Sequence, residues 1–283
     1  MSRGSNKGGR YDAMFARLRT RGEGAFGAFV MLGDPDLETS AAILDALVEG
    51  GADMLEVGIP FSDPIADGPV IQAAAARALK QGARQADCFA LLTKFRAGHP
   101  DVPVGILTYA NLVAAHGRDA FYRAAAAAGV DSVLVADVPA FEAEPFVEAA
   151  RAEGIAPVMI AAANTPPETL KRIAALGEGY TYCLARAGVT GATPDMTLDH
   201  GGMLAALAEA GAPPPVLGFG ISTPKQVRTA LASGAAGAIS GSAIVKLVET
   251  GAPIAPFVAA MKAATLPLEP TNSKLMETDD VRR

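Results

Sequence analysis

The sequence predicts an α/β protein built as a single (β/α)8 barrel, the TIM-barrel architecture, with an extra helix at the N-terminus. Short β-type runs alternate with alanine-rich helical runs from Gly24 onward, and the 283 residues hold about eight such units. Acidic residues and glycines recur after many different predicted strands, as they do at the C-terminal face of a barrel. The alternative, a doubly wound open sheet, is less favoured because no G-x-G-x-x-G follows the first strand.

The predicted strands are short and bounded by glycine, proline or aspartate: residues 25–32, 54–58, 104–108, 132–136, 156–160, 180–184, 215–218 and 237–240. The clearest helices between them begin near proline or end near glycine: residues 37–50, 119–128, 145–153, 167–176 and 224–233. A helix over 11–21 is expected to plug the N-terminal side of the barrel. We expect one catalytic domain over 11–266, with flexible ends at 1–10 and 267–283.

Composition narrows the class of protein. Apolar residues make up 50% and charged residues 19%, which allows a large core. The net charge of −6 argues against nucleic acid or an anionic membrane as a partner. The two cysteines form no disulfide framework, the N-terminus lacks a signal-peptide pattern, and no apolar run approaches the ~18 residues of a spanning helix. These features predict a cytoplasmic protein without membrane contact.

Glu56 is the most unusual residue, because it interrupts the apolar run 54–59 that otherwise reads as a buried strand. A buried carboxylate costs several kcal/mol unless it is paired, protonated or used. It is either satisfied by an Arg, a Tyr or backbone N–H groups, or it is a proton shuttle whose pKa burial raises. Asp63 and Asp67 follow in a loop rich in proline; each alone is typical of a turn. Together the three acids favour general acid/base chemistry.

Two glycine-rich stretches, 218–224 and 240–246, each follow a predicted strand and precede a helix. Backbone N–H groups at such helix N-termini bind phosphate, and in barrels this site forms after strands seven and eight. Tight packing is the alternative explanation. A third glycine-containing segment, 186–191, follows the sixth strand and is either a mobile loop or a plain connection.

Missing residue types restrict the reaction further. His99, His116 and His200 have no metal-ligand spacing, so no metal site is predicted. Every lysine falls on a predicted helix or terminus, which argues against imine chemistry, and no serine sits in a nucleophile elbow. These patterns favour acid/base catalysis on a phosphorylated small molecule.

Seven motifs resemble one family, the α subunit of tryptophan synthase. They occur in family order and cover nearly all of 11–265: Leu-Gly-Asp-Pro at 32–35, Leu-Glu-Val-Gly-Ile-Pro-Phe-Ser-Asp-Pro-Ile-Ala-Asp-Gly-Pro at 55–69, Tyr-Ala-Asn-Leu at 109–112, Asp-Ser-Val-Leu-Val-Ala-Asp-Val-Pro at 131–139, Arg-Ala-Gly-Val-Thr-Gly at 186–191, Gly-Phe-Gly-Ile-Ser at 218–222 and Gly-Ala-Ile-Ser-Gly-Ser-Ala-Ile-Val-Lys at 237–246. Thr108 departs from the pattern, since a larger apolar residue is often found there.

The resemblance implies retro-aldol cleavage of indole-3-glycerol phosphate to indole and D-glyceraldehyde 3-phosphate. It implies Glu56 as the acid/base, Asp67 as the group that holds the indole N–H, and Tyr182 as a further catalytic residue. It assigns substrate contacts to Phe29, Leu107, Tyr109, Leu134, Thr190 and Phe219. It assigns phosphate contacts to Gly191, Gly220, Gly241 and Ser242, and a place at the partner interface to Asp63.

The resemblance also implies a partner, the tryptophan synthase β subunit, in an α2β2 tetramer. The β subunit is expected to carry pyridoxal phosphate and to receive the indole, so this chain needs no cofactor of its own. Two alternatives stay open: a stand-alone lyase that releases indole, and a module that mainly activates the β subunit. Indole-glycerol-phosphate synthase is disfavoured because it needs a catalytic lysine at a strand end.

Overall fold

The computed structural model describes residues 9–184 and 200–267. All the strands pair in parallel in one sheet with the order β5-β4-β3-β2-β1-β9-β8-β7-β6. The strands are β1 (Ala25–Met31), β2 (Met54–Gly58), β3 (Val104–Thr108), β4 (Ser132–Val135), β5 (Ala156–Pro157), β6 (Met159–Ala161), β7 (Thr181–Leu184), β8 (Pro215–Gly218) and β9 (Gly237–Ser240).

The sheet closes because its two end strands are consecutive in the chain. Only Val158 separates β5 from β6, and its N–H donates to the Val133 carbonyl at 3.0 Å, so pairing with β4 continues through the break. The single strand predicted over 156–160 is therefore present as two short segments, β5 beside β4 and β6 beside β7. The predicted (β/α)8 barrel is confirmed.

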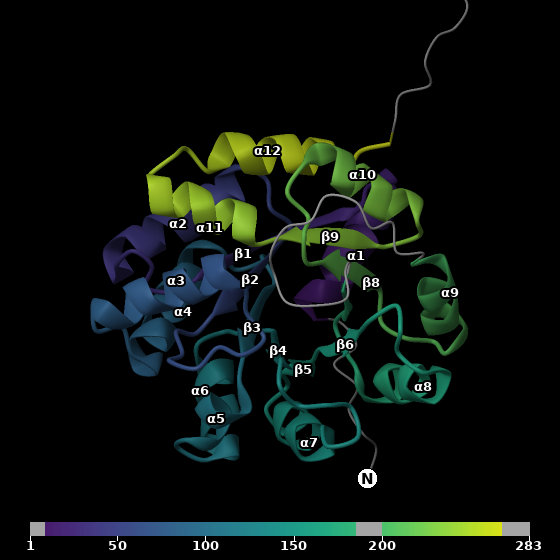
Figure 1. The fold of residues 1–283 in the computed structure, drawn as a ribbon, viewed down its shortest axis with the longest axis horizontal. Helices are drawn as coiled ribbons and strands as arrows, with labels where there is room; N and C mark the ends of the chain where they lie inside the picture. The colour runs from purple at the N-terminus through teal and green to yellow at the C-terminus, as the bar shows by residue number, and fades with distance from the viewer. Residues whose placement is uncertain (1–8, 185–199, 268–283) are drawn as a thin grey trace, which may run out of the picture.

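Helices surround the strands, as Figure 1 shows. They are α1 (Arg10–Arg21), α2 (Leu37–Glu49), α3 (Pro69–Lys80), α4 (Gln85–Gly98), α5 (Ala110–Ala114), α6 (Arg118–Ala127), α7 (Glu144–Ala152), α8 (Pro167–Leu176), α9 (Gly201–Glu209), α10 (Pro224–Ala232), α11 (Ser242–Thr250) and α12 (Ala255–Ala263). The described helices include none long and apolar enough to cross a membrane.

Helix α1 is the predicted N-terminal plug. Its buried side chains, Tyr11, Met14, Phe15 and Leu18, belong to the same apolar cluster as the inward-facing residues of the strands. In Figure 1 the helix lies within the outline of the strand ring rather than in the outer ring of helices. The Tyr11 and Ser132 hydroxyls lie 2.9 Å apart inside the barrel. The extra helix thus closes one end of the barrel and extends its core.

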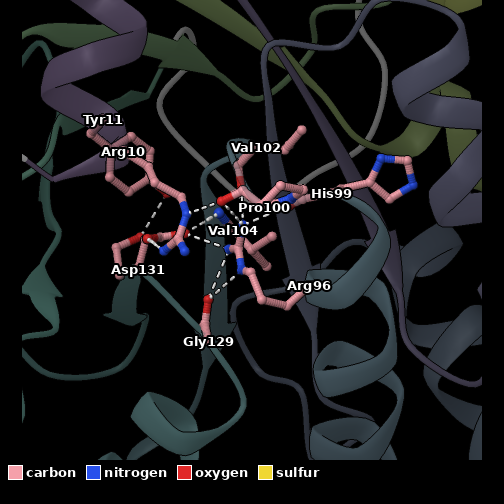
Figure 2. A network of polar contacts seen from close by, with 10 residues as sticks. Arg10, Tyr11, Arg96, His99, Pro100, Val102, Val104, Gly129 and Asp131 are labelled. Carbon is pink, nitrogen blue, oxygen red and sulfur yellow. Dashed lines mark hydrogen bonds and ion pairs between the residues drawn. The ribbon is translucent and has the colours of Figure 1, made fainter.

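A polar network fixes the N-terminal rim beside α1 (Figure 2). Asp131, just before β4, accepts hydrogen bonds at 2.8 Å from Arg10, from Arg96 and from the Val104 N–H. Arg96 also donates to the backbone carbonyls of Gly129 and Val102. The Arg96 guanidinium is mostly buried, and its hydrogen bonds join α4 to the segments that precede β3 and β4. Charge-assisted hydrogen bonds of this kind stabilise the N-terminal end of the barrel.

The barrel interior is arranged in layers set by the strand register. Phe29 pairs with Glu56, Glu56 with Gly105, and Gly105 with Ser132. A Cβ on Gly105 would lie 2.5 Å from the Ser132 hydroxyl and 3.0 Å from that of Tyr11. Glycine at this position therefore lets the plug helix reach the layer that contains Glu56.

Candidate active site

A cavity opens at the C-terminal ends of the strands and gathers most of the sequence-predicted site residues. It is lined by Phe29, Glu56, Asp67, Ile71, Leu107, Tyr182, Phe219, Gly220, Ile239, Gly241 and Ser242. These residues come from β1, β2, β3, β7, β9, the loop before α3, the loop after β8 and the first turns of α3 and α11. A cavity lined by apolar side chains, two acids and the start of a helix suits a mostly apolar ligand that also carries an anionic group.

Glu56 lies in β2 and is 2% exposed. The Tyr180 hydroxyl donates to its Oε1 at 2.8 Å. Burial raises the Glu56 pKa to about 7, and the nearby Asp67 charge adds to the rise, while the Tyr180 hydrogen bond opposes it. The structure thus shows the tyrosine partner that the sequence left open for this buried acid. A Glu56 pKa near neutrality is also compatible with proton transfer, the second alternative.

Asp67 lies in the loop between β2 and α3, and Tyr109 holds it. The Tyr109 hydroxyl donates to Oδ2 of Asp67 at 2.9 Å and accepts from the Ala66 N–H at 3.2 Å. The Phe61 ring packs on the Tyr109 ring with centroids 5.2 Å apart. Burial raises the pKa of Asp67, and the Tyr109 hydrogen bond works against the rise. The loop thus presents its second aspartate to the cavity and fixes its orientation.

Tyr180 directly precedes β7 and Tyr182 lies within it, and both side chains belong to the inner apolar cluster. Tyr182 borders the cavity, and its ring meets the Phe219 ring edge-on with centroids 6.5 Å apart. A Cβ on Gly218 would lie 2.2 Å from the Tyr182 hydroxyl oxygen, so glycine leaves the space that this ring fills. Sequence reasoning missed Tyr180, although the period of two along a strand places it on the same face as Tyr182.

The far end of the cavity is built from backbone. Phe219 and Gly220 both adopt left-handed conformations, with φ of 66° and 84°, and such strain at a non-glycine residue is typical of functional loops. Helix α11 begins at Ser242 with Gly241 as its N-cap and no side-chain cap. A Cβ on Gly241 would make only ordinary contact with Phe29, at 3.5 Å, so packing there does not require glycine. Unsatisfied N–H groups at this helix start favour an anion.

The remaining predicted residues lie as follows. Leu134 is buried in the inner apolar cluster but does not line the cavity, and Tyr109 reaches the site through Asp67. Asp63 is exposed in the same loop, where the Ser62 hydroxyl donates to it at 2.6 Å. Thr190 and Gly191 lie outside the described residues. Ile71 and Ile239 line the cavity without having been predicted, because an apolar residue in an apolar run carries no distinguishing signal.

Within residues 9–184 and 200–267, no three side chains of His, Cys, Asp or Glu are grouped to hold a metal ion.

Comparison with known proteins decides the family. The sequence profile of the tryptophan synthase alpha chain family matches residues 15–268. The chain belongs to that family. It is 58% identical over 264 residues to the tryptophan synthase alpha chain of Shewanella amazonensis, covering 90% of this chain and 99% of the relative. The alpha chain of Klebsiella pneumoniae is 53% identical over 264 residues, with 90% and 98% covered.

Solved structures show the same fold. A protein of Aquifex aeolicus VF5 superposes with a TM-score of 0.82 at 31% identity, covering 92% of this chain and 100% of that one. A chain of Mycobacterium tuberculosis tryptophan synthase gives 0.82 at 28% identity, covering 91% and 98%. As a tryptophan synthase alpha chain, the protein is a lyase of tryptophan biosynthesis that cleaves indole-3-glycerol phosphate. The family has no cofactor of its own, and pyridoxal phosphate belongs to the β subunit.

Proposed function

We propose that Glu56 transfers the protons of this cleavage and that Asp67 holds the indole N–H. The observation that carries the proposal is the place of Glu56, a buried acid that lines the cavity together with Asp67; its burial raises its pKa to about 7. At neutral pH both forms of such an acid are populated, so one group can donate a proton and then accept one.

In the first proposed step of the reaction, protonated Glu56 donates its proton to C3 of the indole, and the ring becomes an indoleninium cation. The Asp67 carboxylate accepts a hydrogen bond from the ring N–H and stabilises that charge. The Glu56 carboxylate then accepts the proton of the glycerol hydroxyl next to the breaking bond. The C–C bond breaks, its electron pair returns to the ring, and indole and glyceraldehyde 3-phosphate form with Glu56 protonated again.

The other site residues have binding roles in this proposal. Phe29, Leu107 and Phe219 enclose the indole and glycerol portions, while Leu134 supports Leu107 from the next strand, its register partner. Tyr182 borders the reacting groups, and Tyr109 positions Asp67. Gly220, Gly241 and Ser242 bind the phosphate at the start of α11, and Thr190 and Gly191 complete the site from the loop outside the described residues.

We further propose that the chain works in the cytoplasm as one catalytic domain, over 11–266, in an α2β2 tetramer with the β subunit. The loop that carries Asp67 supports the partner proposal. In this loop Asp63 is exposed, and Ile65, two residues before Asp67, is 74% exposed. An exposed apolar residue at the rim of a site is typical of an interface. Indole would then pass directly to the β subunit and its pyridoxal phosphate.

The catalytic roles are tested by measuring indole release from indole-3-glycerol phosphate with Glu56→Gln and Asp67→Asn. Loss of a general acid/base costs about 10²–10⁴-fold in rate, so we expect losses in that range. Glu148→Gln on α7 is the matched control, because it removes an exposed carboxylate that does not line the cavity. Undiminished turnover in Glu56→Gln would remove the assigned role.

A mixing experiment tests the partner. If the chain and a tryptophan synthase β subunit co-elute and the rate of indole formation rises, the tetramer is supported. If no complex elutes and the rate stays the same, the stand-alone lyase is the better description. Asp63→Asn should weaken the complex while the basal rate of the isolated chain stays unchanged.

A further inference from the structure

Helix α3 adjoins the reacting end of the site at two points. Asp67 lies two residues before the first residue of α3, Pro69, and Ile71 in the first turn lines the cavity. Any movement of this helix therefore moves Asp67 and one wall of the cavity together.

Helix α3 packs against its neighbours mainly through short side chains. Its buried face consists of Ile71, Ala74, Ala75 and Ala78, which pack in the inner apolar cluster. Methyl groups on a helix form shallow ridges, so they interlock weakly with their neighbours and oppose sliding less than long side chains do. A polar contact on α3 would therefore add a constraint on its position that alanine methyl groups do not supply.

Arg77 supplies that constraint. Its Nε and Nη2 donate to the two carboxylate oxygens of Asp34 at 2.8 and 2.9 Å, and Nη1 donates to Glu249 at 3.0 Å. Asp34, in the loop between β1 and α2, is 2% exposed. Across the described part of the chain, no other α3 side chain makes a hydrogen bond or ion pair to another helix or to that loop. A bidentate pair with a buried carboxylate fixes direction as well as distance.

The third partner extends the link to the phosphate end of the site. Glu249 lies on α11, whose first residue, Ser242, lines the cavity. Helices α3 and α11 are in contact, and Figure 1 shows them next to each other. Glu249 is half exposed, so its pair with Arg77 is weak, whereas the buried Asp34 pair is the strong one.

We propose that Arg77 is a positioning residue: through Asp34 it fixes the helix that follows Asp67, and so sets the distance between Asp67 and the phosphate-binding end of the cavity. Arg77 touches no substrate in this scheme and acts through Asp67. The inference rests on the proposed function, because it needs Asp67 to contact the indole.

The main test is Arg77→Lys, which keeps the charge but cannot form both bonds to Asp34. Misplacing a reacting group by about 1 Å costs up to about 100-fold, so we expect kcat to fall by about tenfold or more. The dissociation constant for sn-glycerol 3-phosphate, measured by calorimetry, should change by less than about twofold, because that ligand needs only the α11 end. Glu249→Gln is the control and should leave kcat within about twofold.

A double-mutant cycle separates positioning from general damage. If Arg77 acts through Asp67, adding Arg77→Lys to Asp67→Asn should cost much less than it costs alone. The double variant Asp34→Asn/Arg77→Met removes the pair without leaving a buried charge unpaired, and should reproduce the loss of kcat in folded protein.

Three results would overturn the inference. They are an unchanged kcat in Arg77→Lys, an equal loss of glycerol 3-phosphate binding, and full additivity with Asp67→Asn. Failure of the proposed function looks different, because Glu56→Gln and Asp67→Asn would then keep full activity whatever Arg77→Lys does.

Discussion

Replacing Glu56 with glutamine should stabilise the folded protein at pH 8 and have little effect on stability at pH 4.5. Burial raises the pKa of Glu56 from its ordinary value of 4.5 to about 7 in the fold. Between these two values the folded state keeps a proton that the unfolded state has released, so wild-type stability falls as pH rises. Glutamine has no proton to lose and is nearly the same shape.

The size of the effect follows from the interval between the two pKa values. Each pH unit of the interval corresponds to about 1.4 kcal/mol, so the range from 4.5 to about 7 amounts to about 3 kcal/mol. The free energy of unfolding of Glu56→Gln minus that of wild type should therefore rise by about 3 kcal/mol between pH 4.5 and pH 8. Most of the rise should lie between pH 4.5 and pH 7, where the folded-state group keeps its proton and the unfolded-state group has lost it, and the difference should level off above pH 7.

Urea unfolding of both proteins across this pH range measures the difference directly. Glu148→Gln controls for the loss of one negative charge and should show no comparable rise. If the difference between Glu56→Gln and wild type does not change with pH, Glu56 is not a buried acid with a raised pKa. If the variant is less stable at pH 8, the carboxylate is a stabilising group, and the reasoning about its proton fails as well.

Three further predictions concern the same structure. Tyr180→Phe removes a hydrogen bond that favours the Glu56 carboxylate, so the Glu56 inflection in the pH profile of kcat/KM should move up by about one pH unit; a downward move would contradict this. Thr108→Val should raise the free energy of unfolding by about 1 kcal/mol, because the buried Thr108 hydroxyl lacks a partner among the described residues, and a less stable variant would reveal one. Arg96→Met should lower the free energy of unfolding by about 1–3 kcal/mol, since it removes one of the three donors to Asp131 and the side-chain donor to the Gly129 and Val102 carbonyls; a loss below 1 kcal/mol in urea unfolding would show the network to be unimportant.

The architecture could be predicted because its signals are local. Strand and helix patterns alternate along the chain, and the strands are bounded by turn residues whose chemistry is readable one segment at a time. The break at Val158 was not predicted, although Pro157 directly before it has no N–H to donate to a neighbouring strand and is disfavoured inside a sheet. Whether such a strand stays continuous also depends on its pairing with two different neighbours, because β4 pairs with its first half and β7 with its second.

Some residues of the candidate site carried a local sequence signal, and others did not. Glu56 was noticeable because a charge in an apolar run is costly, and the glycines of the phosphate end were noticeable because they stand before helices. Tyr180 and Arg77 gave no such signal, since a tyrosine near a strand and an arginine on a helix are ordinary. Their importance comes from partners 124 and 43 residues away in the chain, Glu56 and Asp34, and only the fold brings these together.

Helix α1 has a consequence for the order of events during synthesis. It leaves the ribosome before every strand of the barrel, yet Tyr11 packs against Ser132 and Tyr180, and the strand that follows α1 pairs with β9. The helix therefore has no complete place to dock until most of the protein exists. A helix that is made before every strand is therefore among the last elements to be enclosed, and the barrel around the layer that holds Glu56 closes only when β9 pairs with β1.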